Sequence, residues 1–259
     1  MCVFDTSYDY KSDNQGQSGF DADRDSDQLK ADHELLWTKE LPSGVLFEPK
    51  APTESVKRRN NYLLFDGGSL GRHVYGSDAI TNSYTDWTTP YALADAIASL
   101  DEEQKSRYLN QPYTIGSAMI WPVQTKEQRE AQGRVQTMNQ ARKSSVFDRM
   151  DLTLECIRRY YAGDPRHPLN KITEAYGEFF ELFEDFRNFV DFFHFQDLVT
   201  PDYKVRYFLP LDPFKCAGTP ASREEYIEYR ENVLAFIEGR NRRMADWVRK
   251  HHCDVEDDG

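Results

Sequence analysis

Apolar residues recur at a helical spacing over most of the second half of the chain. Three long stretches with this pattern predict helices over residues 146–162, 170–198 and 220–250. Thr219 followed by Pro220 is a typical start for the last of these, because proline suits the first turn after a capping residue. The apolar face of the middle stretch is mostly phenylalanine, and it predicts a Phe-rich core.

Shorter apolar runs separated by turn residues occupy much of the first half and predict strands. The predicted strands are Val3–Tyr10, 45–48, 62–65, 113–121, 134–138 and, between the last two long helices, 205–211. The polar residues between 121 and 134 are expected to form the exposed tip of a hairpin. Further helices are predicted over 27–37 and within 90–109, where Pro90 suits a first turn and Asp101-Glu102-Glu103 opens a second helix. This order predicts an α+β fold, in which a small, mostly antiparallel sheet from the N-terminal half packs against long C-terminal helices.

The length of 259 residues suits a single domain over 1–259 with a substantial core. Residues 12–27 are rich in Asp, Gly and Ser and predict a mobile acidic loop, while residues 253–259 predict a disordered tail. The formal net charge is −12, with 44 acidic and 32 basic side chains. Such a surface repels phosphate, which argues against a nucleic-acid-binding protein.

The cysteines show neither a metal-binding nor a disulfide pattern. They are Cys2, Cys156, Cys216 and Cys253. Their wide spacing excludes a zinc finger and favours a reducing, cytoplasmic compartment. The first residues do not resemble a signal peptide, and no run approaches the roughly 18 apolar residues of a membrane span. No phosphate-binding loop, nucleophile elbow, zinc-protease or EF-hand pattern is present, so the sequence identifies no cofactor or metal.

Residues 148–159, with the sequence DRMDLTLECIRR, predict a helix with two different faces. The core face carries Met150, Leu154, Ile157 and Tyr161, and the opposite face carries Asp148, Asp151, Glu155, Arg158 and Arg159. A solvated face is one interpretation, because Glu155 is spaced to pair with Arg158 and Arg159 and the charges match the helix dipole. Asp151 and Glu155 are like charges one turn apart, however, which indicates a cation or an arginine from elsewhere.

Several stretches of the chain together resemble a family of uncharacterised bacterial proteins, a domain of unknown function. They are Phe4-Asp5-Thr6 with Asp9, His33–Trp37 with Lys39 and Leu41–Gly44, Ser77–Ile80, Tyr113–Gly116, Asn139 with Arg142, 148–159, and Phe183–Arg187 with Asp197–Val199. The resemblance runs over nearly the whole chain and implies no activity. The chain departs from the family pattern at Lys143, where a glycine is common, and at His194, where an aliphatic residue is common.

This resemblance suggests that polar residues of these stretches converge on one pocket. The candidates are Asp5, Asp9, Asp78, Asn139, Arg142, Asp148, Arg149, Asp151, Glu155 and Arg158. Arg142 and Arg158 would bind the phosphate or carboxylate of a small anionic metabolite or nucleotide. Asp148, Asp151 or Glu155 would act as the catalytic base or as a metal ligand. Asn139, Arg149, Asp5 and Asp78 would complete the substrate-binding set.

The same residues also fit a purely structural role, as a buried ion-pair network that holds the sheet to the helix over 146–162. A second functional hypothesis comes from Arg187 and His194, whose spacing resembles the Arg-x(4–6)-His motif of the HEPN ribonucleases. In that family the pair lies at a dimer cleft and acts on the RNA 2′-hydroxyl. A third hypothesis is a non-catalytic protein-interaction module that uses the acidic surface.

Overall fold

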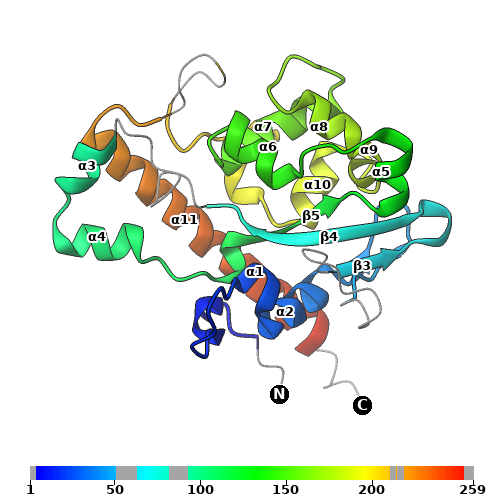
Figure 1. Ribbon diagram of the computed structural model, residues 1–259, viewed down its shortest axis with the longest axis horizontal. Helices are drawn as coiled ribbons and strands as arrows, with labels where there is room; N and C mark the ends of the chain where they lie inside the picture. Colours follow the sequence, from blue (N-terminus) through cyan, green and yellow to red (C-terminus); the bar gives the residue numbers. More distant parts are fainter. Residues whose placement is uncertain (1–3, 51–62, 82–92, 211–213, 215–218, 254–259) are drawn as a thin grey trace.

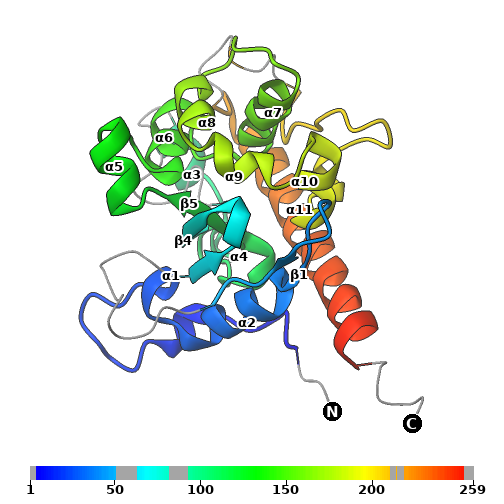
Figure 2. The ribbon, with the colours of Figure 1, turned by 90° about the vertical axis from the view of Figure 1, so that its right-hand side faces the viewer.

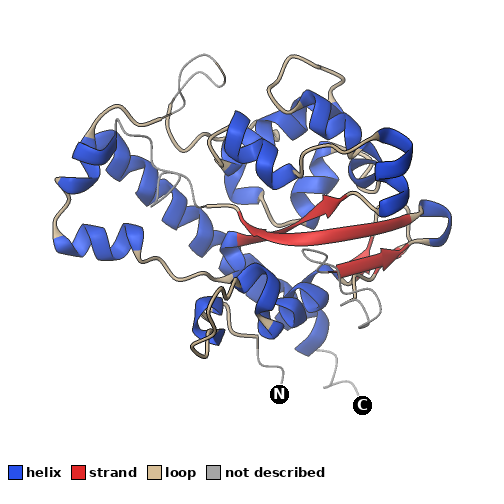
Figure 3. Cartoon of the chain, viewed as in Figure 1, coloured by secondary structure: helices blue, strands red, loops and turns tan. Residues whose placement is uncertain are grey.

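A central three-stranded sheet organises the protein. The computed structural model describes residues 4–50, 63–81, 93–210, 214 and 219–253. The sheet has the order β3-β4-β5, with β3 at Leu63–Asp66, β4 at Arg72–Ala79 and β5 at Ala118–Val123, and both pairings are antiparallel (Figure 3). A separate antiparallel pair is formed by β1 (Lys39–Glu40) and β2 (Leu46–Phe47).

Helices cover both faces of the sheet (Figures 1 and 2). One face carries α5 (Lys126–Gln132), α6 (Met138–Ser145), α7 (Met150–Tyr161), α8 (Asn170–Ala175), α9 (Gly177–Glu181) and α10 (Phe186–Phe192). The other face carries α1 (Ala22–Asp25) and α2 (Asp27–Trp37). The long α11 (Arg223–Val248) contacts α2 and α3 (Ala94–Ala98), and α4 (Glu102–Leu109) follows α3. The short turns are η1 (Tyr10–Asp13), η3 (Gly68–Leu70), η6 (Ile115–Ser117), η7 (Gln196–Leu198) and η8 (Arg249–Cys253).

Consecutive residues of β4 link the sheet to these two layers. Ser77 pairs with Ile120 and Asp78 with Met119 in the β4–β5 register. Because neighbouring side chains of a strand point to opposite faces, Ser77 faces the α1 side and Asp78 faces the α6 side. The contacts agree with this: Ser77 bonds to α1, whereas Asp78 pairs with α6. The two faces of β4 therefore carry different polar clusters.

The core is rich in phenylalanine, as predicted. The buried rings include Phe179, Phe180, Phe183, Phe186, Phe189, Phe192, Phe193 and Phe195. Many of them pack edge to face, for example Phe189 against Phe183 with ring centroids 5.5 Å apart, an arrangement that adds to the energy of burial. The α+β architecture, with a small antiparallel sheet and long C-terminal helices, is confirmed.

The predicted helix over 170–198 is wrong in its continuity. The chain forms α8, α9 and α10 there, followed by η7. Glu184 and His194 have φ angles of 64° and 57°, in the left-handed region that a right-handed helix cannot include. The apolar spacing was real, because the Phe rings are buried, but these two residues turn the backbone between helical pieces.

The predicted hairpin over 113–138 is wrong in its second half. Only Ala118–Val123 of the first stretch is a strand, and the supposed tip is α5. The stretch 134–138 leads into α6 rather than pairing with β5. Both helices begin with a capping box, from Thr125 to Gln128 and from Thr137 to Gln140. These Thr-x-x-Gln patterns are the signal that a count of apolar residues alone overlooks.

Other boundaries also differ from the prediction. Residues 4–9 contain a turn at Thr6-Ser7 instead of a strand, and among the described residues 205–210 only Val205 makes a bridge, to Val199. The strand β4 was not predicted, and α11 begins at Arg223, capped by Ser222, rather than at Pro220.

Some of the remaining predicted elements are confirmed, and others fall on residues outside the described part of the chain. The strands at 46–47 and 63–65 and the helices over 27–37 and 102–109 are confirmed. The segment 12–27 includes α1, and residues 90–92 and 254–259 lie outside the described part. Among the described residues, no helix is both long and apolar enough to cross a lipid bilayer.

Candidate functional site

Arg142 lies at the centre of a buried ion-pair cluster on the α6 side of the sheet. Its side chain is 0% exposed, and its guanidinium contacts both Asp78 and Asp148 at 3.2 Å. Its Nε donates to Thr153 Oγ1 at 3.1 Å, and its plane lies 5.2 Å from the Trp121 ring. The guanidinium is therefore engaged on all sides by the protein itself.

The turn between α6 and α7 brings Asp148 back to Arg142. Phe147 and Asp148 have φ angles of 57° and 59°, which few non-glycine residues adopt. This turn places the Asp148 N–H 3.0 Å from the Arg142 carbonyl and its carboxylate against the guanidinium. It also explains why α7 begins at Met150 rather than at residue 146.

The other acids of the predicted helix face are buried in separate pairs. Asp151 accepts two hydrogen bonds from Arg149 and one from the Phe208 N–H at 2.9 Å. Glu155 accepts from Arg158 at 2.7 and 2.9 Å and from Arg159 at 2.7 Å. Burial pulls the pKa of Glu155 upward, but these arginine bonds outweigh it, and the pKa is lowered.

This helix face is not solvated, so that interpretation was wrong for its acids. Asp148, Asp151 and Glu155 are 1%, 0% and 3% exposed. Of the predicted site residues, the structure brings Asp78, Arg142 and Asp148 together. Arg149 with Asp151, and Arg158 with Glu155, form pairs of their own. The geometry thus favours the structural network over a shared substrate pocket.

Asp5 and Asn139, two of the predicted substrate contacts, form no ion pair or hydrogen bond with the Arg142 cluster among the described contacts. Asp5 is exposed and accepts bonds from Ser7 in a local turn, which lowers its pKa. Asn139 is half-buried on α6, and within the described part of the chain its Oδ1 has no hydrogen-bond partner. No group of three or more His, Cys, Asp or Glu side chains in the described residues is arranged to hold a metal ion.

Arg187 and His194 do not form the helical pair of the ribonuclease hypothesis. The helix α10 ends at Phe192, and the positive φ of His194 turns its ring away from the helical path. His194 is 6% exposed, and its Nε2 lies 3.3 Å from Lys39 Nζ. Burial and the nearby cations lower its pKa to about 2. Arg187 is exposed and covers the Tyr203 ring at 4.6 Å. The His194 ring is therefore neutral and packed in the protein, which argues against a catalytic role in RNA cleavage.

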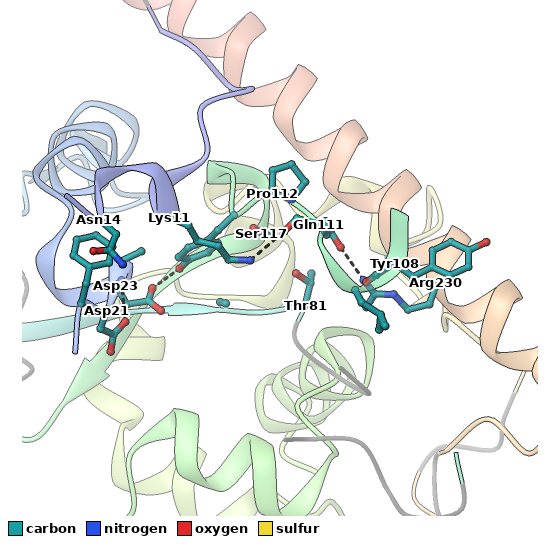
Figure 4. A pocket seen from close by; sticks show the side chains of 15 residues that line it. Lys11, Asn14, Asp21, Asp23, Thr81, Tyr108, Gln111, Pro112, Ser117 and Arg230 are labelled. Carbon is teal, nitrogen blue, oxygen red and sulfur yellow. Dashed lines mark hydrogen bonds between the residues drawn. The ribbon is translucent and has the colours of Figure 1, made fainter. Parts of the chain in front are cut away.

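A cavity of about 610 Å³ lies on the opposite side of the sheet (Figure 4). Its walls come from η1, α1, the end of β4, the segment between α4 and η6, and α11. This volume falls within the range of pockets that hold small molecules. Figure 4 shows Asp21 and Asp23 at one end, Arg230 at the other, and Lys11 and Thr81 between them.

Asp23 forms the acidic end together with the neighbouring Asp21. Ser77 Oγ donates to Asp23 Oδ1 at 2.8 Å, and the Tyr113 hydroxyl donates to the same oxygen. Ser77 Oγ also lies 3.0 Å from His33 Nε2, while Trp37 Nε1 lies 2.9 Å from His33 Nδ1. These contacts make a continuous hydrogen-bonded chain from the core to the cavity.

The directions of the bonds from Trp37 to His33 and from His33 to Ser77 are fixed. An indole N–H can only donate, so His33 accepts from Trp37 at Nδ1 and carries its proton on Nε2. Burial lowers the pKa of His33 to about 3, which keeps the ring neutral. His33 therefore donates to Ser77, and Ser77 donates to Asp23. The Asp23 carboxylate is the final acceptor of this chain of hydrogen bonds.

Burial is also the main influence on the acidic end. It raises the pKa of Asp23 to about 6, and the nearby Asp21 adds to this. On the far face of β4, burial and the charge of Asp23 raise the pKa of Asp78. Lys143 acts against both shifts. Asp23 is thus a carboxylate that loses its proton only near neutral pH.

Arg230 forms the basic end and is 1% exposed. Its Nη2 donates to the Tyr108 carbonyl at 2.6 Å and to Gln111 Oε1 at 2.9 Å. Within the described part of the chain, its Nε and Nη1 have no hydrogen-bond partner. Lys11 Nζ donates to the Gln111 carbonyl at 3.1 Å, so a second cation lies beside the same segment. A buried guanidinium with spare donors is costly unless something accepts from them.

The sequence pattern alone did not predict this cavity. His33, Ser77 and Tyr113 belong to three of the stretches that carry the family resemblance; Ser77 and Tyr113 bond to Asp23, and His33 is linked to it through Ser77. Asp23 itself lies in the segment predicted as a mobile loop. Arg230 was not singled out, although an arginine within the mainly apolar face of α11 is a recognisable signal.

The fold and the cavity define an α+β protein with an acidic end and a basic end in one pocket. The chain belongs to DUF6994, a family of unknown function, and the match covers residues 4–244. The resemblance to an uncharacterised family is thereby confirmed. No curated protein and no solved structure matches the chain.

Proposed function

We propose that the protein binds a small organic anion, such as a metabolite or nucleotide with a phosphate or carboxylate group, in the cavity. The observation that carries this proposal is Arg230, a buried guanidinium on the cavity wall whose Nε and Nη1 lack partners among the described residues. An oxyanion would accept from these donors and neutralise the charge. Charge-assisted hydrogen bonds of this kind are about twice as strong as neutral ones.

The remaining walls support a small polar ligand. Lys11 adds a second positive charge, and Thr81 and Ser117 add hydroxyl groups that can donate or accept. The volume of about 610 Å³ is enough for a nucleotide or a sugar phosphate. The wide spacing of the cysteines supports a reducing, cytoplasmic setting for this ligand. The Arg142 cluster is then a scaffold that holds α6 and α7 against β4.

A thermal-shift screen tests the proposal directly. The panel contains inorganic phosphate, nucleotides, sugar phosphates and small carboxylates. A ligand at a hundredfold excess over its dissociation constant adds about 2.7 kcal/mol to the free energy of unfolding, which such a screen detects. We expect a hit that disappears in Arg230→Lys, because lysine keeps the charge but lacks the Nε and Nη1 donors.

Arg240→Lys is the matched control, because Arg240 is a buried arginine on the same helix that binds backbone carbonyls instead of the cavity. It should lower the melting temperature and leave the ligand shift intact. A screen without any hit, or a hit that survives Arg230→Lys, would rule out the proposed site.

A further inference from the structure

We infer that the ligand carries a cationic amine in addition to its anionic group, and that Asp23 binds this amine at the acidic end of the cavity. The inference rests on the proposed function, since it assumes that the anion occupies the basic end. It adds the substrate class: a zwitterion whose two charges are separated along the cavity. The first support is the polarity of the walls, with Asp21 and Asp23 at one end and Arg230 at the other (Figure 4).

The second support is the way in which Asp23 is held. Both of its side-chain partners, Ser77 and Tyr113, donate to Oδ1. An ionised carboxylate has no proton to donate, so Ser77 and Tyr113 are both donors to Asp23. The carboxylate is therefore orientated as an acceptor, and a ligand group that binds it must be a donor.

The third support is the charge balance around Asp23. Among the described residues Asp23 forms no salt bridge, although Asp21 lies beside it and Asp78 lies across β4. Lys143 is the cation whose charge reaches Asp23, and that lysine is 4.0 Å from Asp78. A buried carboxylate in acidic surroundings is stabilised most by a cation that also donates hydrogen bonds. An ammonium group supplies both the positive charge and the hydrogen-bond donors, whereas a hydroxyl supplies only a donor.

Three series of probes of equal length separate these possibilities. The probes are carboxylates of increasing chain length whose other end is an amine, a hydroxyl or a methyl group. If the thermal-shift screen selects phosphates, alkyl phosphates with the same three end groups replace the carboxylates. Binding is measured by titration calorimetry at pH 7.5. At the best length, we expect the amine probe to bind at least about tenfold more tightly than the methyl probe, a difference of about 1.4 kcal/mol.

Asp23→Asn should remove this preference without weakening the methyl probe, because an amide keeps the bonds from Ser77 and Tyr113 but has no charge. The matched control is Asp25→Asn on the same short helix, whose carboxylate pairs with Arg24 near the surface. It should preserve the preference for the amine. Circular dichroism and melting curves of both variants establish that each remains folded.

The outcomes distinguish the inference from the proposed function. If no anion binds, including the methyl probes, both are overturned. If the amine, hydroxyl and methyl probes bind with equal affinity, only the inference of a zwitterionic ligand is overturned. A hydroxyl probe as tight as the amine would exclude a cationic partner, and a preference that survives Asp23→Asn would exclude Asp23 as its site.

Discussion

Arg230 and Arg240 are both buried arginines of α11, but they are hydrogen-bonded to different extents within the described part of the chain. Arg240 donates to the carbonyls of Phe193, Gly116 and Ala118 at distances of 2.7–3.1 Å. Arg230 uses Nη2 alone among the described residues, although it is 1% exposed. Arg240 therefore leaves one nitrogen, Nη2, without a partner among the described residues, whereas Arg230 leaves two, Nε and Nη1, and is the one that lines the cavity.

This contrast predicts unequal losses of stability from the same substitution. Arg240→Lys breaks several buried hydrogen bonds of a charged group, and should lower the free energy of unfolding by about 3 kcal/mol or more. Arg230→Lys breaks two bonds instead of three and should cost less. Urea unfolding at pH 7.5 measures both. Equal losses would mean that Arg230 is as fully engaged as Arg240.

Arg142 should be the most sensitive residue of the ion-pair cluster. Arg142→Met leaves Asp78 and Asp148 buried without their cation, which should cost about 3–5 kcal/mol. Arg158→Met is the comparison, because that arginine is 37% exposed and Glu155 keeps Arg159; it should cost about 1 kcal/mol or less. Urea titrations measure both. If Arg142→Met were as mild as Arg158→Met but lost ligand binding, Arg142 would belong to a binding site after all.

The half-buried Asp23 should give the protein a characteristic pH dependence. Its pKa of about 6 in the folded state lies above the ordinary value of 3.8, so the folded state binds the proton more tightly. Asp23 therefore supports folding fully at pH values below 3.8, and this support is lost as the pH rises through about 6. Relative to wild type, Asp23→Asn should gain stability between pH 4 and pH 7.

Melting temperatures of both proteins over this range measure the effect. The difference between the two proteins matters rather than either curve, because Glu155 has a lowered pKa and acts in the opposite direction. A difference that stays constant from pH 4 to pH 7 would show that Asp23 titrates as an ordinary carboxyl.

Gly116 should not tolerate a side chain, because η6 lies directly against α11. A Cβ at this position would lie 2.6 Å from the Ile237 carbonyl and 2.5 Å from Asn241 Oδ1. Gly116→Ala should therefore cost about 1–3 kcal/mol. Gly177→Ala is the control, since its nearest neighbour is the Tyr160 hydroxyl, the far end of a side chain, at 3.1 Å. Urea unfolding that finds equal losses for the two variants would contradict this packing.

The local patterns of the sequence were sufficient to predict the core but not its polar partners. Met150, Leu154 and Ile157 are buried as their helical spacing predicts. That spacing also assigned Asp151 to the opposite, charged face, yet Asp151 is buried because the Phe208 N–H, far along the chain, bonds to it. The spacing of residues within one helix contains no information about such a distant partner.

The cavity was beyond sequence prediction for the same reason. His33 of α2, Ser77 of β4 and Tyr113, just before η6, are far apart along the chain, and only the fold connects them to Asp23 of α1. The loop composition of residues 12–27 concealed α1, whose Asp21 cap and short length leave little helical pattern. The backbone reversals at Glu184 and His194 were equally invisible, because these residue types do not require a positive φ.

The two ends of the cavity are made at very different times during synthesis. Asp23 leaves the ribosome well before Arg230, which follows only after the sheet and the helices α5–α10 have been translated. No nascent chain that ends before Arg230 can hold a ligand between both charges. A ligand of the proposed kind therefore cannot guide the folding of the segments translated before Arg230, and it would stabilise only chains in which α11 has already docked.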